Sequence, residues 1–374
     1  MTTTENIGGN QKKDIIEPQI NLVAWEVTRS CNLYCAHCRA SASSQPYEDE
    51  LTTEECFRVI DQILEVGRPI IILTGGEPLV RKDVFTIAEY ASGKGLRVAM
   101  GSNGTLITDE IATKLEAVPI PRVAISIDFP VAELEDEFRG LKGAFESAMR
   151  GIDIARRAGI GIQINSTITR LNAQYLEDLI SLALKVGAGA FHPFMLVPTG
   201  RGKSLKSVEL SPQEYEDILG WIYDRQIELG DRLFFKPTDA PHYLRIMAQK
   251  QKEGRRSGHP PSQRPAHSGG HPAQSISRGC LAGTGFAFIS HQGRVQGCGY
   301  LDVAAGNLRQ QSFGDIWTNS PVFNNLRDLS NIKGKCGVCE YKRICGGCRA
   351  RAYEATGDYL EEEPYCIYQP AALQ

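Results

Sequence analysis

The sequence contains no run that approaches the roughly 18 consecutive apolar residues of a membrane-spanning helix. Its N-terminus, MTTTENIGGNQKKDIIEPQ, is polar and lacks the apolar stretch of a secretion signal. No charge of either sign dominates, since 41 basic residues stand against 44 acidic ones, so there is no general basic field for nucleic acid. These absences predict a soluble, cytoplasmic protein, and its 374 residues suffice for one large domain and a small one.

Cysteine, in contrast, is plentiful, with eleven residues in the chain. Disulfides are disfavoured because the cytosol keeps thiols reduced. Three cysteines lie between Cys31 and Cys38, Cys56 stands alone, and seven lie between Cys280 and Cys366. Thiols gathered in this way in a reducing compartment usually bind metal. Cys56 lies within a predicted helix and is expected to be a small buried apolar residue.

Apolar, β-branched runs alternate with helix-period stretches along the first two thirds of the chain. The predicted strands are 21–28, 69–76, 97–103, 122–128, 161–169 and 189–197. The predicted helices are 53–66, 83–94, 108–116, 143–158, 174–186 and 212–229. Strands that are apolar throughout and joined by helices pair in parallel with both faces covered, which predicts an α/β fold with a (βα)6 partial barrel. In such sheets ligands bind at the carboxyl ends of the strands.

The remaining segments set the expected domain boundaries. Residues 1–20 are predicted to be a disordered tail, and residues 21–235 to be the partial barrel. Residues 236–278 form a bridging segment, in which 250–277 is rich in Pro, Gly, Ser and basic residues and is predicted to be a flexible loop. Residues 279–374 carry most of the cysteines and are predicted to be a small cysteine-rich domain.

The first cysteine group, Cys31-Asn-Leu-Tyr-Cys35-Ala-His37-Cys38, follows the first predicted strand directly. Three thiolates on one short loop can bind three irons of a cubane cluster and leave the fourth iron without a protein ligand. That iron can then chelate a small molecule through an amine and a carboxylate. The alternative is a zinc site that His37 or a distant residue completes.

The motif Thr74-Gly75-Gly76-Glu77-Pro78 ends the second predicted strand. Together with the three-cysteine loop it resembles the radical S-adenosylmethionine (SAM) superfamily, in which the open iron of a [4Fe–4S] cluster takes the amino and carboxylate groups of SAM. The resemblance implies that the backbone of this motif and Glu77 hold the SAM amine, with the glycines letting the backbone approach the ligand. It also implies that SAM is cleaved to a 5′-deoxyadenosyl radical, which abstracts hydrogen from an unactivated carbon.

Polar residues at later strand ends are further candidates for binding the SAM ribose and carboxylate. They are Ser102, Asn103, Ser126, Asp128, Asn165 and Thr167. Such residues are also common turn formers, so each signal is weak alone. Arg139, within EDEFRG, corresponds to an arginine that contacts the SAM carboxylate in the superfamily, and the alternative is a surface arginine at a helix start.

The C-terminal cysteines fall into two spacings. Cys280 is followed by Gly293 and Cys298, and a C-x2-C-x5-C-x2-C run with one later cysteine comes after them. The members of that run and the last cysteine are Cys336, Cys339, Cys345, Cys348 and Cys366. Zinc ribbons usually separate their pairs by about 15–20 residues, and a single zinc would leave three of these cysteines without a role. The pattern resembles the SPASM domain, which binds up to two auxiliary [4Fe–4S] clusters.

The SPASM resemblance implies an assignment of the seven thiols to two clusters. One cluster takes Cys336, Cys339, Cys345 and Cys366, and the other takes Cys280, Cys298 and Cys348. This sequence departs from the fullest pattern, because an upstream eighth cysteine is absent and the last spacing is x2 instead of x3. The second cluster is therefore expected either to keep an open iron or to take a ligand that is not cysteine.

Longer stretches in both parts of the chain, among them VAWEVTRSCNLYCAHCRA and CGGCRARAYEATGDYLEEEPYC, resemble the heme synthases of the siroheme-dependent heme pathway. The resemblance implies oxidative decarboxylation of two propionates of Fe-coproporphyrin III to vinyl groups, giving heme b, with a low-potential electron donor such as ferredoxin or flavodoxin. Candidate cations for the substrate carboxylates are Arg29, Arg39, Arg201, Lys203, Arg349 and Arg351. Candidate histidines for the iron or a propionate are His192, His242 and His291. Each of these residues has a structural or solvated alternative role.

Three other functions stay open at this point. A peptide or protein maturase has the same architecture, but those that act on leader peptides often carry an N-terminal recognition domain, and only 20 residues precede the first predicted strand. A radical SAM enzyme for another modified heme precursor is closer. A non-catalytic iron–sulfur or heme carrier is a third alternative, which the intact three-cysteine loop and GGEP motif disfavour.

Overall fold

A computed structural model describes residues 14–256 and 278–374, and its framework is a single ten-stranded sheet. The strands are β1 (Leu22–Thr28), β2 (Ile70–Gly75), β3 (Arg97–Ser102), β4 (Arg122–Ser126), β5 (Gly161–Ile168), β6 (Ala190–Met195), β7 (Phe234–Phe235), β8 (Phe286–Ile289), β9 (Arg294–Gln296) and β10 (Ala304–Asn307). Their order is β10-β9-β8-β1-β2-β3-β4-β5-β6-β7. Strands β8 and β1 to β7 pair in parallel, whereas β9 and β10 are antiparallel additions. The sheet is curved but not closed, as expected for a partial barrel.

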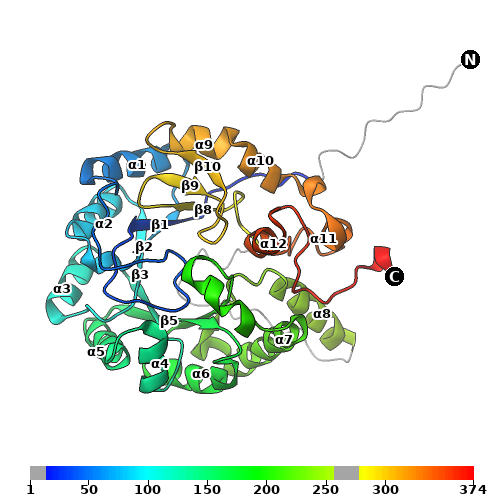
Figure 1. The fold of residues 1–374 in the computed structure, drawn as a ribbon, viewed down its shortest axis with the longest axis horizontal. Coiled ribbons are helices and arrows are strands. Elements are labelled where there is room, and N and C mark those ends of the chain that lie inside the picture. Colours follow the sequence, from blue (N-terminus) through cyan, green and yellow to red (C-terminus); the bar gives the residue numbers. More distant parts are fainter. Residues whose placement is uncertain (1–13, 257–277) are drawn as a thin grey trace, which may run out of the picture.

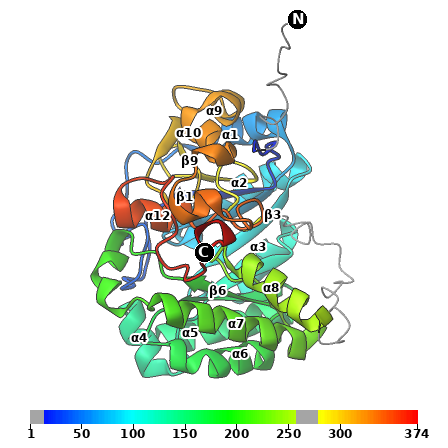
Figure 2. The same ribbon diagram turned by 90° about the vertical axis from the view of Figure 1, so that its right-hand side faces the viewer.

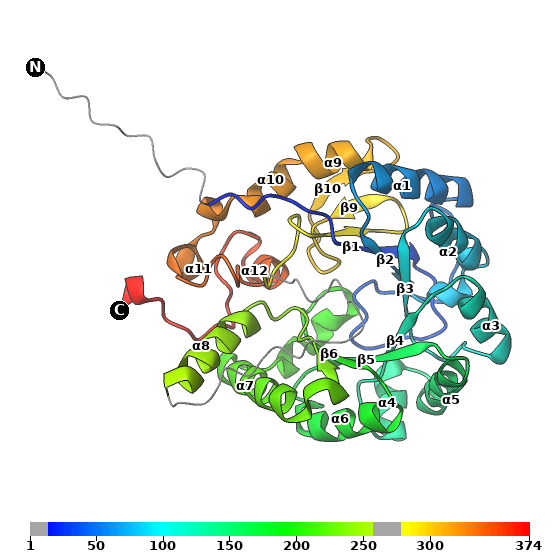
Figure 3. The ribbon, with the colours of Figure 1, turned by 180° about the vertical axis from the view of Figure 1, so that it is seen from behind.

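Helices cover the outside of this sheet (Figures 1 and 3). They are α1 (Thr53–Val66), α2 (Val84–Gly93), α3 (Asp109–Ala117), α4 (Ala132–Arg139), α5 (Ala144–Arg157), α6 (Leu176–Lys185), α7 (Pro212–Leu229), α8 (Tyr243–Arg256), α9 (Phe313–Asn319), α10 (Pro321–Arg327), α11 (Gly334–Val338) and α12 (Arg349–Thr356). In Figure 1, α11 and α12 lie between α10 and α7, and Figure 2 also shows α12 between these two helices. Within the described ranges, no helix combines the length and apolar composition needed to cross a bilayer.

Alternation along the strands separates the two faces of the sheet. On β1, Val23, Trp25 and Val27 are fully buried against the helices, while Glu26 and Thr28 face the other way, into the barrel. This two-residue period is a property of every extended strand. The inward positions at the strand ends carry polar side chains, which places the candidate site inside the carboxyl end of the barrel.

Two helices begin at reciprocal capping boxes that the sequence already contains. Thr52 and Glu55 exchange side-chain and backbone hydrogen bonds at the start of α1, and Ser211 and Glu214 do the same at the start of α7. Each box satisfies two backbone donors that lack partners inside the helix. Cys56 lies on the buried face of α1 and is fully buried, as expected.

All six predicted strands are present within two residues of their predicted bounds, but two further strands belong to the parallel sheet. β7 has only two residues, too few for a recognisable pattern. β8 comes from the cysteine-rich region and pairs beside β1, with Leu22 opposite Phe286. The C-terminal region therefore continues the barrel sheet and shares its apolar core.

Two of the predicted irregular segments are partly wrong. Residues 14–20 are not a free tail, since the N–H of Ile16 donates to the carbonyl of Arg327 and Ile20 is buried. Residues 250–256 belong to α8 instead of a loop. Residues 1–13 and 257–277 lie outside the described residues. Helix α4 was not expected at all, because its sequence AELEDEFR carries five charged residues in eight positions.

Candidate active site

The three-cysteine loop follows β1. Its backbone N–H groups donate to the end of α4, and these hydrogen bonds hold the loop at the carboxyl end of the barrel. The N–H of Tyr34 donates to the carbonyl of Arg139 (3.0 Å), and the N–H of Ala36 donates to the carbonyl of Phe138 (2.9 Å). Arg201 also fixes the loop, because its guanidinium donates to the carbonyls of Cys35 (2.9 Å) and Ala42 (2.6 Å). The end of α4 and the segment after β6 therefore fix the loop from two directions.

Each sulfur of this loop accepts an N–H group. Cys31 Sγ accepts from the N–H of Leu33 (3.3 Å), and Cys38 Sγ accepts from the N–H of Ala42 (3.4 Å). Cys35 Sγ lies 3.8 Å from a guanidinium nitrogen of Arg139. Such donors stabilise the negative charge of metal-bound sulfur.

The same surroundings disfavour an uncompensated thiolate. Burial raises the pKa of Cys31 to about 12 and also raises the pKa of Cys35. A bound metal ion would offset the cost of burying a thiolate, because metal binding is coupled to loss of the thiol proton. Within the part of the chain that the structure describes, no three His, Cys, Asp or Glu side chains converge on a point as ligands of a single metal ion do. The thiolates of a cubane bind different irons and need not converge on one point, so this absence does not bear on a cluster.

The glycine pair of the GGEP motif has a structural cause that the sequence did not reveal. A Cβ atom on Gly75 would lie 2.2 Å from the carbonyl oxygen of Thr28, and one on Gly76 would lie 2.3 Å from that of Ser30. No side chain fits at such distances. The glycines therefore let the end of β2 contact the start of the three-cysteine loop, whatever they do for a ligand.

Glu77 joins the ends of β2 and β3 through its buried carboxylate. It accepts hydrogen bonds from Ser102 Oγ (2.9 Å), from the N–H of Asn103 (2.7 Å) and from the N–H of Leu79 (3.1 Å). Complete burial raises the pKa of Glu77 to about 7. Asn103 continues the chain of contacts, with its side-chain amide 3.9 Å from Cys31 Sγ. Three sequence candidates thus form one connected unit beside the loop.

Arg139 is the centre of a buried ionic group. Its guanidinium lies 2.5 Å from the Asp128 carboxylate and 2.8 Å from that of Glu135, and all three side chains are almost fully buried. The idea of a surface arginine at a helix start is therefore wrong, since Arg139 ends α4 and is 4% exposed. His37 stacks on Phe138 and has its Nε2 atom 3.7 Å from Asp128.

The remaining candidates on β4 to β6 line the barrel interior at one level. Ser126 is the neighbour of Asn165 across the sheet, and Asn165 is the neighbour of His192. Gln163 donates to Asn165 Oδ1 (2.8 Å) and contacts His192 Nδ1 (3.0 Å). The backbone N–H of Thr167 donates to Asp128 (2.5 Å). These side chains form a polar band below the cysteine loop.

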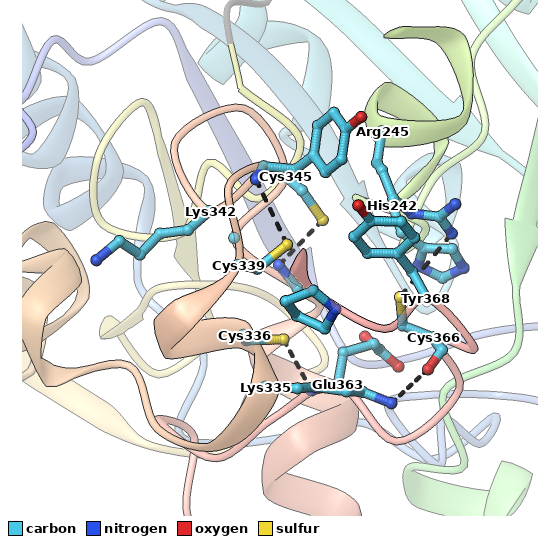
Figure 4. A pocket seen from close by; sticks show the side chains of 14 residues that line it. His242, Arg245, Lys335, Cys336, Cys339, Lys342, Cys345, Glu363, Cys366 and Tyr368 are labelled. Carbon is cyan, nitrogen blue, oxygen red and sulfur yellow. Dashed lines mark hydrogen bonds between the residues drawn. The ribbon is translucent and has the colours of Figure 1, made fainter. Parts of the chain in front are cut away.

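Four C-terminal thiols line one pocket (Figure 4). They are Cys336, Cys339, Cys345 and Cys366, which is the group that the SPASM resemblance implied. Each sulfur has an N–H neighbour, the donors being Glu363 N (3.3 Å), Tyr341 N (3.4 Å), Gly347 N (3.4 Å) and Arg245 Nη2 (3.9 Å), respectively. The fully buried His242 lines the same pocket, and neither of its ring nitrogens has a hydrogen-bond partner among the described residues.

The other three C-terminal thiols also lie near one another. Burial raises the pKa of Cys298, and the charges of Cys348 and Cys280 raise it further. Burial likewise raises the pKa of Cys348, with Cys280 again among the neighbouring charges. Cys298 Sγ accepts from the N–H of Tyr300 (3.5 Å). Four of the seven thiols thus line one pocket, the charges of the other three act on one another, and the assignment to two clusters stays a prediction.

Most of the cations expected to bind substrate are engaged with protein. Arg39 pairs with Glu26 at 2.6 Å, and together with His291 it holds the pKa of Glu26 at about 2 although burial opposes this. Arg29, Arg201, Arg349 and Arg351 each donate to backbone carbonyls. Lys203 is largely exposed. These five arginines therefore have protein partners, and their contact with a substrate stays a prediction.

Lys236 was missed because it follows the two-residue strand β7. Its backbone N–H donates to the carbonyl of Phe191 (3.2 Å), and by alternation with the buried Phe235 it shares the face of Phe234, whose ring contacts His192. Burial lowers the pKa of the Lys236 ammonium, whose charge in turn contributes to lowering the pKa of His192. The sequence gives no signal for Lys236, because β7 is too short to produce a strand pattern.

Comparisons with known proteins agree with this architecture. Residues 25–183 match the Radical SAM superfamily, and residues 280–349 match the iron–sulfur cluster-binding SPASM domain. The chain is 50% identical over 349 residues to the AdoMet-dependent heme synthase of Methanosarcina barkeri (strain Fusaro / DSM 804), covering 93% of this chain and 97% of that protein. It is 30% identical over 361 residues to the Fe-coproporphyrin III synthase of the same organism, covering 92% and 87%.

Among solved structures, Streptococcus suis SuiB bound to S-adenosylmethionine superposes with a TM-score of 0.71, over 97% of this chain and 79% of SuiB. At 15% identity this likeness shows the fold alone. The family matches imply SAM and [4Fe–4S] clusters as cofactors. The chain therefore belongs to the radical SAM superfamily, as an enzyme with a SPASM domain in the family of the AdoMet-dependent heme synthases.

Proposed function

We propose that this enzyme converts two propionate side chains of Fe-coproporphyrin III to vinyl groups by SAM-dependent radical oxidative decarboxylation, forming heme b. The observation that carries the proposal is the 50% identity to a heme synthase across both the barrel and the cysteine-rich region. We place the reaction in the cytoplasm, with a low-potential donor such as ferredoxin or flavodoxin.

In this proposal Cys31, Cys35 and Cys38 hold the [4Fe–4S] cluster that binds SAM. When bound, the cluster and SAM supply the 5′-deoxyadenosyl radical that abstracts a hydrogen atom from the substrate. Gly75 to Pro78 and the residues at the following strand ends form the SAM pocket, with Glu77 fixing the ends of β2 and β3. The other pocket residues are Ser102, Asn103, Ser126, Asp128, Arg139, Asn165 and Thr167.

The stoichiometry of the reaction requires a second redox group. Converting a propionate to a vinyl group removes one hydrogen atom and CO2 and leaves one electron over. The seven C-terminal cysteines offer two auxiliary clusters for this purpose, with Cys336, Cys339, Cys345 and Cys366 as ligands of one and Cys280, Cys298 and Cys348 as ligands of the other. The N–H donors at the sulfurs of the four-thiol pocket support this assignment.

Lys236 is our candidate for holding a substrate carboxylate. It lies at the carboxyl end of β7, and its backbone N–H donates to the carbonyl of Phe191, the residue before His192 (3.2 Å). The Asp239 carboxylate is the charge that acts favourably on the Lys236 ammonium, and a propionate would add a second carboxylate to it. His192, with its Nε2 atom buried and unpartnered among described groups, is placed to donate to the same carboxylate.

The direct test is incubation of anaerobically reconstituted enzyme with SAM, a strong reductant and Fe-coproporphyrin III, followed by mass spectrometry. We expect a monovinyl species followed by heme b. An unchanged porphyrin alongside active SAM cleavage would contradict the proposed substrate. Another modified heme precursor or a peptide would then be tested in its place, since an enzyme of this architecture could act on either.

A further inference from the structure

The group of three thiols offers one ligand fewer than a complete cubane needs. Cys280, Cys298 and Cys348 come from the segment before β8, the segment after β9 and the N-cap of α12. The nearby Cys345 belongs to the four-thiol pocket, and Cys56 lies in α1. A fourth protein ligand of this group must therefore be a residue other than cysteine.

Asp239 reaches this group from the barrel. The segment after β7 continues along β6, since the N–H of Thr238 donates to the carbonyl of Pro193 (2.8 Å) and the carbonyl of Thr238 accepts from Met195 (3.0 Å). Asp239 is the next residue. Arg351 of α12, whose N-cap is Cys348, donates to the Asp239 carbonyl (3.0 Å), and the backbone of Gly279, next to Cys280, packs against Pro241. The segment that carries Asp239 therefore lies beside two of the three thiols.

The backbone of Asp239 is held in an unfavourable conformation. Its φ angle is +58°, and the other described non-glycine residue with positive φ is Ser41, at the end of the three-cysteine loop. The Asp239 carbonyl accepts hydrogen bonds from Arg351 Nη1 (3.0 Å) and Tyr215 Oη (3.1 Å). Strained residues persist where surrounding structure over-determines them, and they concentrate at functional sites.

One oxygen of the Asp239 carboxylate, the buried Oδ2, lacks a hydrogen-bond partner among the described residues, and the cations whose charges act on this carboxylate are Arg351 and Lys236. The Arg351 guanidinium near it is already committed to the carbonyls of Met195 and Leu196. Buried carboxylates are normally paired, hydrogen-bonded or bound to metal.

We propose that the Asp239 carboxylate is the fourth protein ligand of the auxiliary cluster whose other ligands are Cys280, Cys298 and Cys348. This inference rests on the cluster assignment in the proposed function. Asp239 ties the cluster to the barrel end of β7, where Lys236 also lies, and so connects the auxiliary site to the interior of the barrel. Binding to the cluster would also give a partner to the Asp239 Oδ2 atom, which has none among the described residues.

The test compares full-length variants that keep the left-handed backbone at this position. Asp239→Gly removes the carboxylate without strain, since glycine adopts positive φ readily. Asp239→Cys restores a ligand as a thiolate. Asp302→Gly is the matched control, because Asp302 is an exposed aspartate of the same region that pairs with Arg294. Iron, acid-labile sulfide and EPR spectra of the reduced, anaerobically reconstituted proteins are measured with saturating SAM.

We expect Asp239→Gly either to lose about four irons per chain or to keep them with an EPR spectrum that changes when imidazole is added. The parent and Asp302→Gly should not respond to imidazole, and Asp239→Cys should keep its iron with an altered spectrum. The inference is overturned if Asp239→Gly matches the parent while Cys280→Ala loses about four irons. If Cys280→Ala also matches the parent, the cluster assignment itself is wrong.

Discussion

The Arg139 guanidinium lies 2.5 Å from the Asp128 carboxylate, directly behind the three-cysteine loop. This contact links the end of α4 to the strand end of β4, and the same guanidinium reaches Cys35 Sγ at 3.8 Å. Glu135 completes the group by accepting from the N–H groups of Asp128 and Phe129. A single buried cation thus connects the loop to the strand ends proposed to bind SAM.

Arg139→Met should destabilise the enzyme strongly. The substitution leaves the Asp128 and Glu135 carboxylates buried without their cation, and breaking a buried ion pair in this way costs about 3–5 kcal/mol. We expect a lower unfolding midpoint in anaerobic denaturant titrations and loss of SAM cleavage. Arg150→Met, on the exposed face of α5, is the control and should change stability by less than about 0.5 kcal/mol. Equal stability of the two variants would contradict the structural role of Arg139.

Gly75→Ala should disrupt the mouth of the barrel, whereas Gly93→Ala should not. A methyl group at Gly75 would meet the Thr28 carbonyl oxygen at 2.2 Å, while one at Gly93 meets nothing within 4 Å. We expect Gly75→Ala to cost about 1–3 kcal/mol of stability and to weaken SAM binding. Gly93→Ala, in helix α2, should be neutral or slightly stabilising. Isothermal titration with SAM and thermal unfolding would measure both effects, and unimpaired SAM binding by Gly75→Ala would count against the close-packed site.

Glu77 should make the metal-free protein less stable as pH rises between about 4.5 and about 7. Its folded pKa is raised by burial to about 7, whereas the unfolded chain titrates near the ordinary value of 4.5. In this window the folded state keeps a proton that the unfolded state releases, so the unfolding free energy falls with pH, by about 3 kcal/mol in total. The contribution is fully present below pH 4.5 and is lost above pH 7. The difference in unfolding free energy between the parent and Glu77→Gln should follow this curve, and a difference independent of pH would contradict it.

Cysteine replacements should separate the two kinds of cluster. Cys35→Ala removes a proposed ligand of the SAM-binding cluster and should abolish formation of 5′-deoxyadenosine. Cys339→Ala should leave SAM cleavage measurable but uncoupled from porphyrin decarboxylation. Cys56→Ala, a buried thiol outside both sites, should keep both activities. Parent-like SAM cleavage in Cys35→Ala would refute the assignment of the three-cysteine loop.

Lys236→Met should impair use of the porphyrin without impairing SAM cleavage. Losing a charge-assisted hydrogen bond to a propionate costs roughly 1.5–3 kcal/mol, so the KM for Fe-coproporphyrin III should rise about tenfold or more. Lys236→Arg should recover part of the loss, and the exposed Lys203→Met should be close to the parent. Steady-state kinetics with the porphyrin varied would measure this, and an unchanged KM in Lys236→Met would remove the residue from the substrate site.

The sequence was sufficient for the barrel because strand periodicity, helix caps and cysteine spacing are local signals. It predicted β1 to β6 closely, whereas the grouping of Cys336, Cys339, Cys345 and Cys366 was implied by the resemblance to the SPASM domain. It could not assign the arginines, because whether Arg39 binds a substrate or pairs with Glu26 depends on contacts distant in sequence. Lys236 and Asp239 were missed for the same reason, since they follow a strand too short to recognise.

The most direct test of the account is to count 5′-deoxyadenosine, CO2 and heme in one anaerobic reaction with SAM, reductant and Fe-coproporphyrin III. We expect one 5′-deoxyadenosine and one CO2 for each propionate converted, and accumulation of heme b. Steady SAM cleavage with neither CO2 nor any vinyl product from the porphyrin would contradict it.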